Sequence, residues 1–206
     1  MSTRVVIVNT GAGNLFSLEK VLSQLNTSVK ISAHPSDIAN ADKIILPGVG
    51  HFETAMTTMR SDGSIDALNE AALHKRKTIL GICLGMQMMA KESEEGETTG
   101  LGWIDAKVTK LKVSDQQRYK VPHICWNGIT VKSDCALTKD ISADSLYYFL
   151  HAYCVQPADK ETIAATTTYE SEFPSVINAG NLYGVQFHPE KSHQAGLRLL
   201  ENFIRI

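Results

Sequence analysis

The sequence predicts an α/β protein of three layers, built on a doubly wound and largely parallel sheet to which antiparallel strands are added. Short apolar runs of strand length alternate with helical patterns between residues 4 and 91, which is typical of parallel strands joined by covering helices. Beyond Gly100 the runs alternate in polarity instead, as antiparallel or edge strands do. With 206 residues, 43% of them hydrophobic, the chain suits a single domain over residues 1–206.

The first half of the chain alternates strands and helices. The β-branched run RVVIV predicts a strand, and leucines and valines at helical spacing predict a helix over Leu15–Leu25. VKIS is a weak second strand, whereas KIILPGVG and TILGI are typical of buried strands. The helices expected between and after them cover Phe52–Arg60, Ile65–His74 and Leu84–Lys91.

The second half of the chain has a different pattern of polar and apolar residues. AKVTKLKV, TIAATTTY and SVINAG alternate in polarity and predict antiparallel or edge strands added to the same sheet. LYGVQF predicts a return to a buried strand, and a helix over Gln194–Ile206 closes the chain. The acidic stretch KESEEGE is expected to be a solvated surface loop.

Composition excludes several classes of function. The formal net charge of −2 creates no field that would attract nucleic acid or an anionic membrane. None of the four cysteines belongs to a CxxC pair or a zinc spacing, so we expect neither a metal nor a cofactor. No run reaches the ~18 apolar residues of a membrane helix, and the first apolar run is too short for a signal peptide. The chain is therefore expected to be soluble and cytoplasmic, with reduced thiols.

The stretch GICLGMQMM places Cys83 at the end of a predicted strand and before a predicted helix. In open α/β sheets, ligands bind at the carboxyl ends of the strands. A nucleophile held on a strand-to-helix turn requires small residues two positions before and after it, and Gly81 and Gly85 meet that requirement. The positive end of the helix dipole would favour the reactive thiolate. The alternative is a structural cysteine buried in the core.

The stretch VQFHPEKS supplies the base that such a nucleophile needs. His188 follows the LYGVQF strand, and Pro189 ends the ladder because it lacks an N–H. In an extended segment Glu190 would point to the same side as His188, accept its ring N–H and fix its tautomer. Cys83, His188 and Glu190 would then form a triad defined by roles rather than by sequence order.

The loop in LPGVG, which ends the KIIL strand, could stabilise negative charge on an attacked carbonyl. Gly48 and Gly50 bracket Val49, so the peptides between them rotate at little steric cost. Backbone N–H groups presented there would form an oxyanion hole. An ordinary β–α turn is the alternative.

PGVG, GICLGMQ and GVQFHPE occur in this order, and with them the whole chain resembles the class I (triad) glutamine amidotransferases, whose fold is flavodoxin-like. The resemblance implies that Cys83 attacks the side-chain amide of glutamine and forms a γ-glutamyl thioester. It implies that His188 is the general base and then the acid for the leaving ammonia, and that Glu190 orients His188. It also implies that Gln87 contacts glutamine and that the N–H of Leu84 completes the oxyanion hole.

Within that class, GAGNL, VPHICWN, YYFLHAY and HPEKS make the chain similar to the glutaminase subunits of imidazole glycerol phosphate synthases. The resemblance implies a heterodimer with a separate (β/α)8 cyclase, which uses the ammonia to make imidazole glycerol phosphate and AICAR in histidine biosynthesis. It places Asn14, Trp126, Tyr148 and Lys191 at the subunit interface. Taken singly, these residues would be a loop cap, two core aromatics and a solvated lysine.

The resemblance also implies gating, in which the Gly48–Val49 peptide of the free subunit points its carbonyl at the site until the partner binds its ligand. Two positions depart from the family: Cys125 stands where glycine is common, on the expected contact surface, and Ala152 stands where a hydroxyl residue is common, near the expected glutamine pocket.

Three alternative functions stay open on the sequence. A paralogous glutaminase could feed a surface-sugar amidination enzyme, since EKSHQAG is similar to such chains. A non-catalytic thiol sensor on the same sheet would need neither His188 nor Glu190. A free-standing γ-glutamyl hydrolase would leave VPHICWN unexplained.

Overall fold

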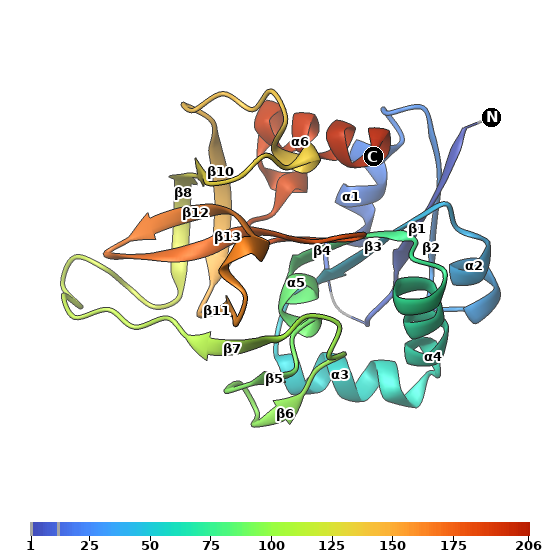
Figure 1. The fold of residues 1–206 in the computed structure, drawn as a ribbon, viewed down its shortest axis with the longest axis horizontal. Helices are drawn as coiled ribbons and strands as arrows, with labels where there is room; N and C mark the ends of the chain where they lie inside the picture. Colours follow the sequence, from blue (N-terminus) through green and yellow to red (C-terminus); the bar gives the residue numbers. More distant parts are fainter. Residues whose placement is uncertain (1, 12) are drawn as a thin grey trace.

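The computed structural model describes residues 2–11 and 13–206, so Ala12 of the GAGNL motif lies outside the described residues. Figure 1 shows a central sheet with helices on both of its faces. The strands of this sheet are β1 (Thr3–Val8), β2 (Thr27–Ser32), β3 (Lys43–Gly48), β4 (Thr78–Cys83), β9 (Thr130–Val131), β12 (Ile163–Tyr169), β13 (Ser171–Ala179) and β14 (Leu182–Val185).

The order across the central sheet is β2-β1-β3-β4-β14-β13-β12-β9. The pairs from β2 to β14 are parallel, and those from β14 to β9 are antiparallel. This arrangement confirms the expected fold class. The strands TIAATTTY and SVINAG join the sheet as antiparallel strands β12 and β13, as predicted.

Helices cover the two faces of the sheet. They are α1 (Leu15–Leu22), α2 (Pro35–Asn40), α3 (Phe52–Ser61), α4 (Ser64–Asn69), α5 (Leu84–Met88) and α6 (His193–Arg205). The side chains of α1 and α6 pack in one hydrophobic cluster, and those of α2 to α5 pack in a second. Successive residues of β1 belong to opposite clusters, Val5 and Ile7 to the first and Val6 and Val8 to the second. Alternate side chains of a strand are therefore buried on opposite faces of the sheet, which accounts for the unbroken apolar runs.

Two smaller sheets flank the central one. The first pairs β8 (His123–Gly128) with β10 (Leu146–His151), and the second contains β5 (Glu92–Ser93), β6 (Thr98–Thr99), β7 (Ala106–Lys110) and β11 (Tyr153–Pro157) in the order β11-β7-β5-β6. The prediction that AKVTKLKV joins the central sheet is wrong, because it forms β7 of the second small sheet. Alternating polarity indicates that a strand is half-buried, but it does not indicate which sheet the strand joins.

Several boundaries also differ from expectation. Helix α1 ends at Leu22 rather than at Leu25, before Asn26 with its positive φ of 54°. The helix expected over Ile65–His74 consists of α4 followed by a π-helical turn, and α5 ends at Met88 rather than at Lys91. Helix α2 escaped prediction because its six residues bury only Ile38. Short 3₁₀ turns cover Ala136–Thr138, Lys160–Thr162 and Pro189–Lys191.

The sheet register brings distant segments to one edge. Gly48 pairs with Cys83 across β3 and β4, and Val185 pairs with Ile82 across β14 and β4. The segment that follows β14 therefore emerges beside Cys83, at the carboxyl ends of three parallel strands. Among residues 2–11 and 13–206, no helix has both the length and the apolar character needed to cross a membrane.

Candidate active site

Cys83 occupies a strained turn between β4 and α5. Its backbone has φ 53° and ψ −108°, a conformation that non-glycine residues rarely adopt, and its side chain is buried. A Cβ on Gly81 would lie 2.7 Å from the backbone nitrogen of Met86, and one on Gly85 would collide with the carbonyl oxygen of Leu46. The expected need for small residues on both sides of Cys83 is thus confirmed.

This steric requirement gives a direct prediction. Gly85→Ala should lower the free energy of unfolding by at least about 3 kcal/mol, because the backbone of β3 or of α5 must move to admit the methyl group. Urea unfolding measures the change. Gly128→Ala is the matched control, since its Cβ would meet nothing closer than the oxygen of Ser145 at 3.9 Å. Equal stabilities for the two variants would contradict the steric account.

His188 and Glu190 lie together beside this turn. Nδ1 of His188 is 3.0 Å from Oε1 of Glu190, and the two side chains are only 2% and 5% exposed. An extended segment was expected here, but the chain instead enters a 3₁₀ turn at Pro189–Lys191. The turn still places both side chains on the same side. The N–H of His188 donates to the carbonyl oxygen of Tyr148 at 2.9 Å, so β10 holds the backbone of this segment.

The electrostatics of His188 depend on its two neighbours. Burial opposes the charged ring, but the sulfur of Cys83 and the carboxylate of Glu190 outweigh it and raise the pKa of His188 to about 10. Nε2 of His188 is buried and has no aligned hydrogen-bond partner among the described protein atoms. The ring of His188 can therefore hold a proton in this buried position.

A cavity of about 90 Å³ opens beside Cys83. Its lining consists of Val49, Gly50, Cys83, Leu84, Gln87, Glu95, Leu150, His151, Ala152 and Tyr153. Three of the four expected oxyanion-hole residues are thus at the cavity, whereas Gly48 lines a smaller neighbouring space with Asn14, His188 and Glu190. Ala152 lies where the glutamine pocket was expected. Among the described residues, no group of three or more His, Cys, Asp or Glu side chains could hold a metal ion.

The side chain of Gln87 is held beside this cavity by two hydrogen bonds. Its amide nitrogen donates to the carbonyl oxygen of Tyr153 at 2.9 Å and to Oε1 of Gln186 at 3.1 Å. Gln186 in turn donates from Nε2 to the sulfur of Cys83 at 3.6 Å. Gln87 lines the cavity as expected, and its contact with glutamine stays a prediction.

Residues 6–206 match the family model described as glutamine amidotransferase class-I. The chain belongs to this family. The amidotransferase is 42% identical over 201 residues to "Imidazole glycerol phosphate synthase subunit HisH 2" of Methanococcus maripaludis, covering 98% of each chain. It is 38% identical over 202 residues to the protein of the same name from Pseudomonas aeruginosa, covering 98% of this chain and 99% of that one.

Solved structures share the fold of the amidotransferase. A structure described as a glutamine amidotransferase superposes with a TM-score of 0.75 at 19% identity and covers 97% of each chain. The glutaminase domain of Trypanosoma brucei CTPS with bound acivicin has a TM-score of 0.65 at 17% identity, covering 99% of this chain and 94% of that one. At these identities the likeness concerns the fold alone.

Sequence reasoning missed several residues that line the amidotransferase's cavity or contact its lining. Glu95 belongs to the acidic stretch expected to be a solvated loop, yet it lines the cavity and accepts the N–H of Phe52 at 2.9 Å. No periodicity distinguishes it from its acidic neighbours. His151 and Gln186 were missed as well, although both lie within motifs that the resemblance used, YYFLHAY and GVQFHPE.

Most of the residues assigned to the partner interface gather on one exposed face. Trp126 is 42% exposed, its ring lies 5.9 Å from that of Tyr148, and the ammonium of Lys191 lies 5.3 Å above the Tyr148 ring. Trp126 is therefore not a core aromatic. Asn14 is exposed where α1 begins, but its side chain does not cap the helix.

The side chain of Cys125 points away from that face. Alternation along β8 turns Ile124 and Trp126 outward, whereas His123 and Cys125 point inward, and the Cys125 sulfur lies 3.0 Å from Nε2 of His123. Cys125 is half-buried, and its place on the contact surface stays a prediction.

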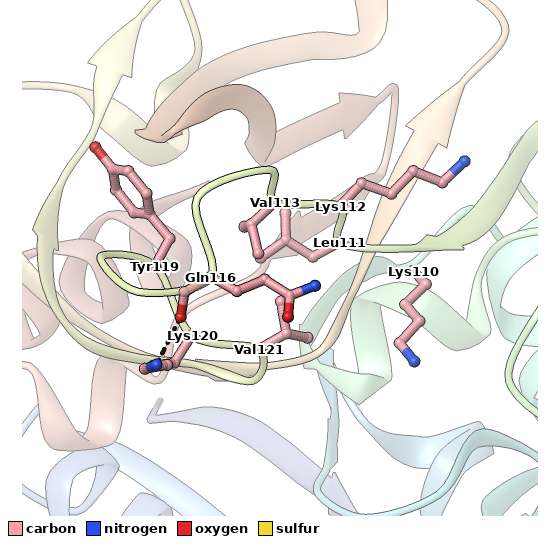
Figure 2. Close-up of a pocket in the computed structure, with 8 residues that line it drawn as sticks. All are labelled: Lys110, Leu111, Lys112, Val113, Gln116, Tyr119, Lys120 and Val121. Carbon is pink, nitrogen blue, oxygen red and sulfur yellow. Dashed lines mark hydrogen bonds between the residues drawn. The ribbon is translucent and has the colours of Figure 1, made fainter.

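A larger cavity of about 600 Å³ lies elsewhere on the amidotransferase. Figure 2 shows its lining, which includes Lys110, Lys112 and Lys120 together with Tyr119. It shares no lining residue with the cavity at Cys83, and neither cysteine nor histidine lines it. Its size does not make it the reaction site, because nucleophilic chemistry on an amide needs a nucleophile and a base within reach of each other.

Proposed function

We propose that this chain is the glutaminase subunit of an imidazole glycerol phosphate synthase. It hydrolyses glutamine to glutamate and ammonia, and supplies the ammonia to a separate (β/α)8 cyclase that makes imidazole glycerol phosphate and AICAR in histidine biosynthesis. The observation that carries the proposal is full-length identity of about 40% to synthase subunits named HisH. These names do not favour delivery of ammonia to a surface-sugar amidination enzyme.

The chemistry follows from the three residues at the sheet edge. The Cys83 thiolate attacks the amide carbon of glutamine, and the oxyanion is held by backbone N–H groups of Leu84 and of the Gly48–Gly50 loop. The C–N bond then breaks, His188 gives its proton to the departing ammonia, and a γ-glutamyl thioester remains. Water, deprotonated by His188, attacks the thioester, so glutamate leaves and the thiolate returns.

Glu190 and the charge of His188 support this sequence of steps. The raised pKa of His188 favours the protonated ring, so the proton needed by the departing ammonia is in place before glutamine binds. The buried carboxylate of Glu190 holds the ring by Nδ1 and leaves Nε2 without a protein partner, so Nε2 is available to exchange protons with the reacting atoms.

Glu95 provides the charge that would select the other end of glutamine. It is the one carboxylate among the lining residues of the cavity, and it is suited to bind the α-ammonium group. Glu95→Gln keeps an oxygen to accept the N–H of Phe52 but removes the charge. We expect the KM for glutamine to rise about tenfold with kcat little changed, because ground state and transition state lose the same contact.

Steady-state kinetics of the complex measure this split, and Glu97→Gln is the control, since Glu97 belongs to the same acidic stretch but does not line the cavity. A fall in kcat at unchanged KM would contradict this role of Glu95.

The outward face of β8 and β10 is suited to receive the cyclase. Ile124, Trp126 and Leu146 are large apolar side chains that remain exposed there, and aromatic anchors of this kind are enriched in interfaces.

Mixing the chain with a histidine-pathway cyclase tests the proposal. We expect glutamate release to be slow for the chain alone and to rise at least about tenfold when cyclase and its nucleotide substrate are both present, because the partner selects the form in which the Gly48–Val49 peptide is flipped. Equal rates with and without the partner and its ligand would contradict the gating. Failure to bind the cyclase, with binding to an amidination enzyme instead, would contradict the pathway.

A further inference from the structure

A chain of buried hydrogen bonds runs from β8 toward the reaction site. Nδ1 of His151 lies 2.9 Å from the carbonyl oxygen of Tyr153, and its Nε2 lies 2.9 Å from Nδ1 of His123. Nε2 of His123 lies 3.0 Å from the sulfur of Cys125. Both imidazole rings are buried, and the contact between them is made away from water.

The contacts permit only one arrangement of protons if both rings are neutral. The Tyr153 carbonyl can only accept, so His151 carries its proton on Nδ1 and accepts on Nε2. His123 must then donate from Nδ1, which leaves its own Nε2 as an acceptor for the thiol of Cys125. Every donor faces an acceptor, which is what a buried polar network requires for stability.

Neutrality follows from the surroundings. Burial lowers the pKa of His151 to about 3, with smaller contributions that include repulsion from His123 and His188, and burial lowers the pKa of His123 to about 4. An imidazolium at position 151 would be repelled by the charged ring of His188. A neutral ring avoids that repulsion at every pH at which the protein works.

The chain continues from Tyr153 to the nucleophile. The Tyr153 carbonyl accepts both the His151 ring and the amide of Gln87, so both of its lone pairs are used. Gln87 cannot turn its amide around, because its oxygen would then face the Tyr153 carbonyl. Its second N–H therefore holds Oε1 of Gln186, which aims the Gln186 amide nitrogen at the Cys83 sulfur.

We propose that His123 and His151 are positioning residues for Cys83. His123 holds His151 in its Nδ1–H tautomer, and His151 holds the Tyr153 carbonyl. That carbonyl orients the Gln87 amide, which in turn orients the Gln186 N–H toward the sulfur of Cys83. The function of this network rests on the proposed glutaminase chemistry, but its proton arrangement and its effect on thiol reactivity do not depend on glutamine.

Ring ¹⁵N NMR of the full chain tests the proton arrangement. We expect the rings of His123 and His151 to be neutral, with the proton on Nδ1, at every point between pH 6 and 8. The His123→Asn and His151→Asn variants each remove one set of signals and so assign them. An Nε2–H tautomer at His151, or titration of either ring within this interval, would overturn the proposal without any variant having to be active.

Alkylation of Cys83 by iodoacetamide tests the effect on the nucleophile. The parent is Cys125→Ser, whose hydroxyl keeps a donor to His123 and removes a competing thiol. In this background His151→Leu should slow alkylation of Cys83 about tenfold at pH 7, because the Gln186 donor loses its orientation. His151→Asn should stay within about threefold of the parent, since its amide nitrogen stands where Nδ1 stood.

Peptide mapping by mass spectrometry assigns the label to Cys83, and thermal melts confirm that each variant is folded. Parent-like alkylation in folded His151→Leu, or an equal loss in His151→Asn, would overturn the positioning role. Failure of the proposed function would show differently, as an intact effect on alkylation in a chain that releases no glutamate with any cyclase.

Discussion

Replacing Cys83 with alanine should lower glutamine-dependent turnover by the synthase complex at least about 10⁴-fold, because none of the other described residues that line the cavity carries a thiol to form the thioester. The same complex should still convert its nucleotide when ammonium salts replace glutamine, since the cyclase reaction needs only free ammonia. A coupled assay with each nitrogen source measures both rates.

Cys135→Ala is the matched control for this substitution. Cys135 is also a buried free cysteine, but it does not line the cavity at Cys83. We expect its glutamine-dependent rate to match that of the unaltered chain. If Cys83→Ala retained glutamine-dependent activity, or lost the ammonium-dependent rate as well, Cys83 would not be the dedicated nucleophile.

Glu190→Gln should reduce glutaminase activity about 10²- to 10⁴-fold, because the amide keeps the shape of the side chain but no longer stabilises the imidazolium of His188. With that charge removed, the pKa of His188 falls from its raised value of about 10. The alkaline limb of the pH–rate profile should therefore move to lower pH. An unchanged alkaline limb would contradict the coupling between the two side chains.

The same coupling predicts a pH dependence of stability. The pKa of His188 is raised in the folded chain above its ordinary value of 6.5. Its charged form therefore contributes stability that is complete below about pH 6.5 and is lost as the pH rises toward 10. In Glu190→Gln this loss should occur at lower pH, and urea unfolding across the alkaline range measures it.

Local rules allowed much of the site to be predicted. The turn at Cys83 depends on its own strand, its own helix and two glycines nearby, so the sequence around it carries the full signal. His188 and Glu190 lie two residues apart, so their proximity could be predicted from the end of a single strand. Their joint position at one sheet edge followed from the parallel topology, which the alternation of strands and helices indicated.

The remainder of the site depends on contacts between distant segments. Glu95 enters the cavity because β5 pairs with β6 and β7. The acidic residues of this stretch give no sequence signal for such strand pairing. His151 and Tyr153 take their positions where the chain passes from one small sheet to the other. The inward position of Cys125 was available from the alternation in VPHICWN, where His123 and Cys125 share one side and Trp126 takes the other.

Labelling with a chloroketone analogue of glutamine, followed by peptide mapping, tests the central claim most directly. Such an analogue occupies the glutamine pocket and alkylates the nucleophile that meets the amide carbon. In the complex with cyclase and nucleotide, we expect one label per chain, located on Cys83, and slower labelling when glutamine is added. A label on another residue, or a labelling rate that glutamine does not change, would contradict the assignment of Cys83 as the group that attacks glutamine.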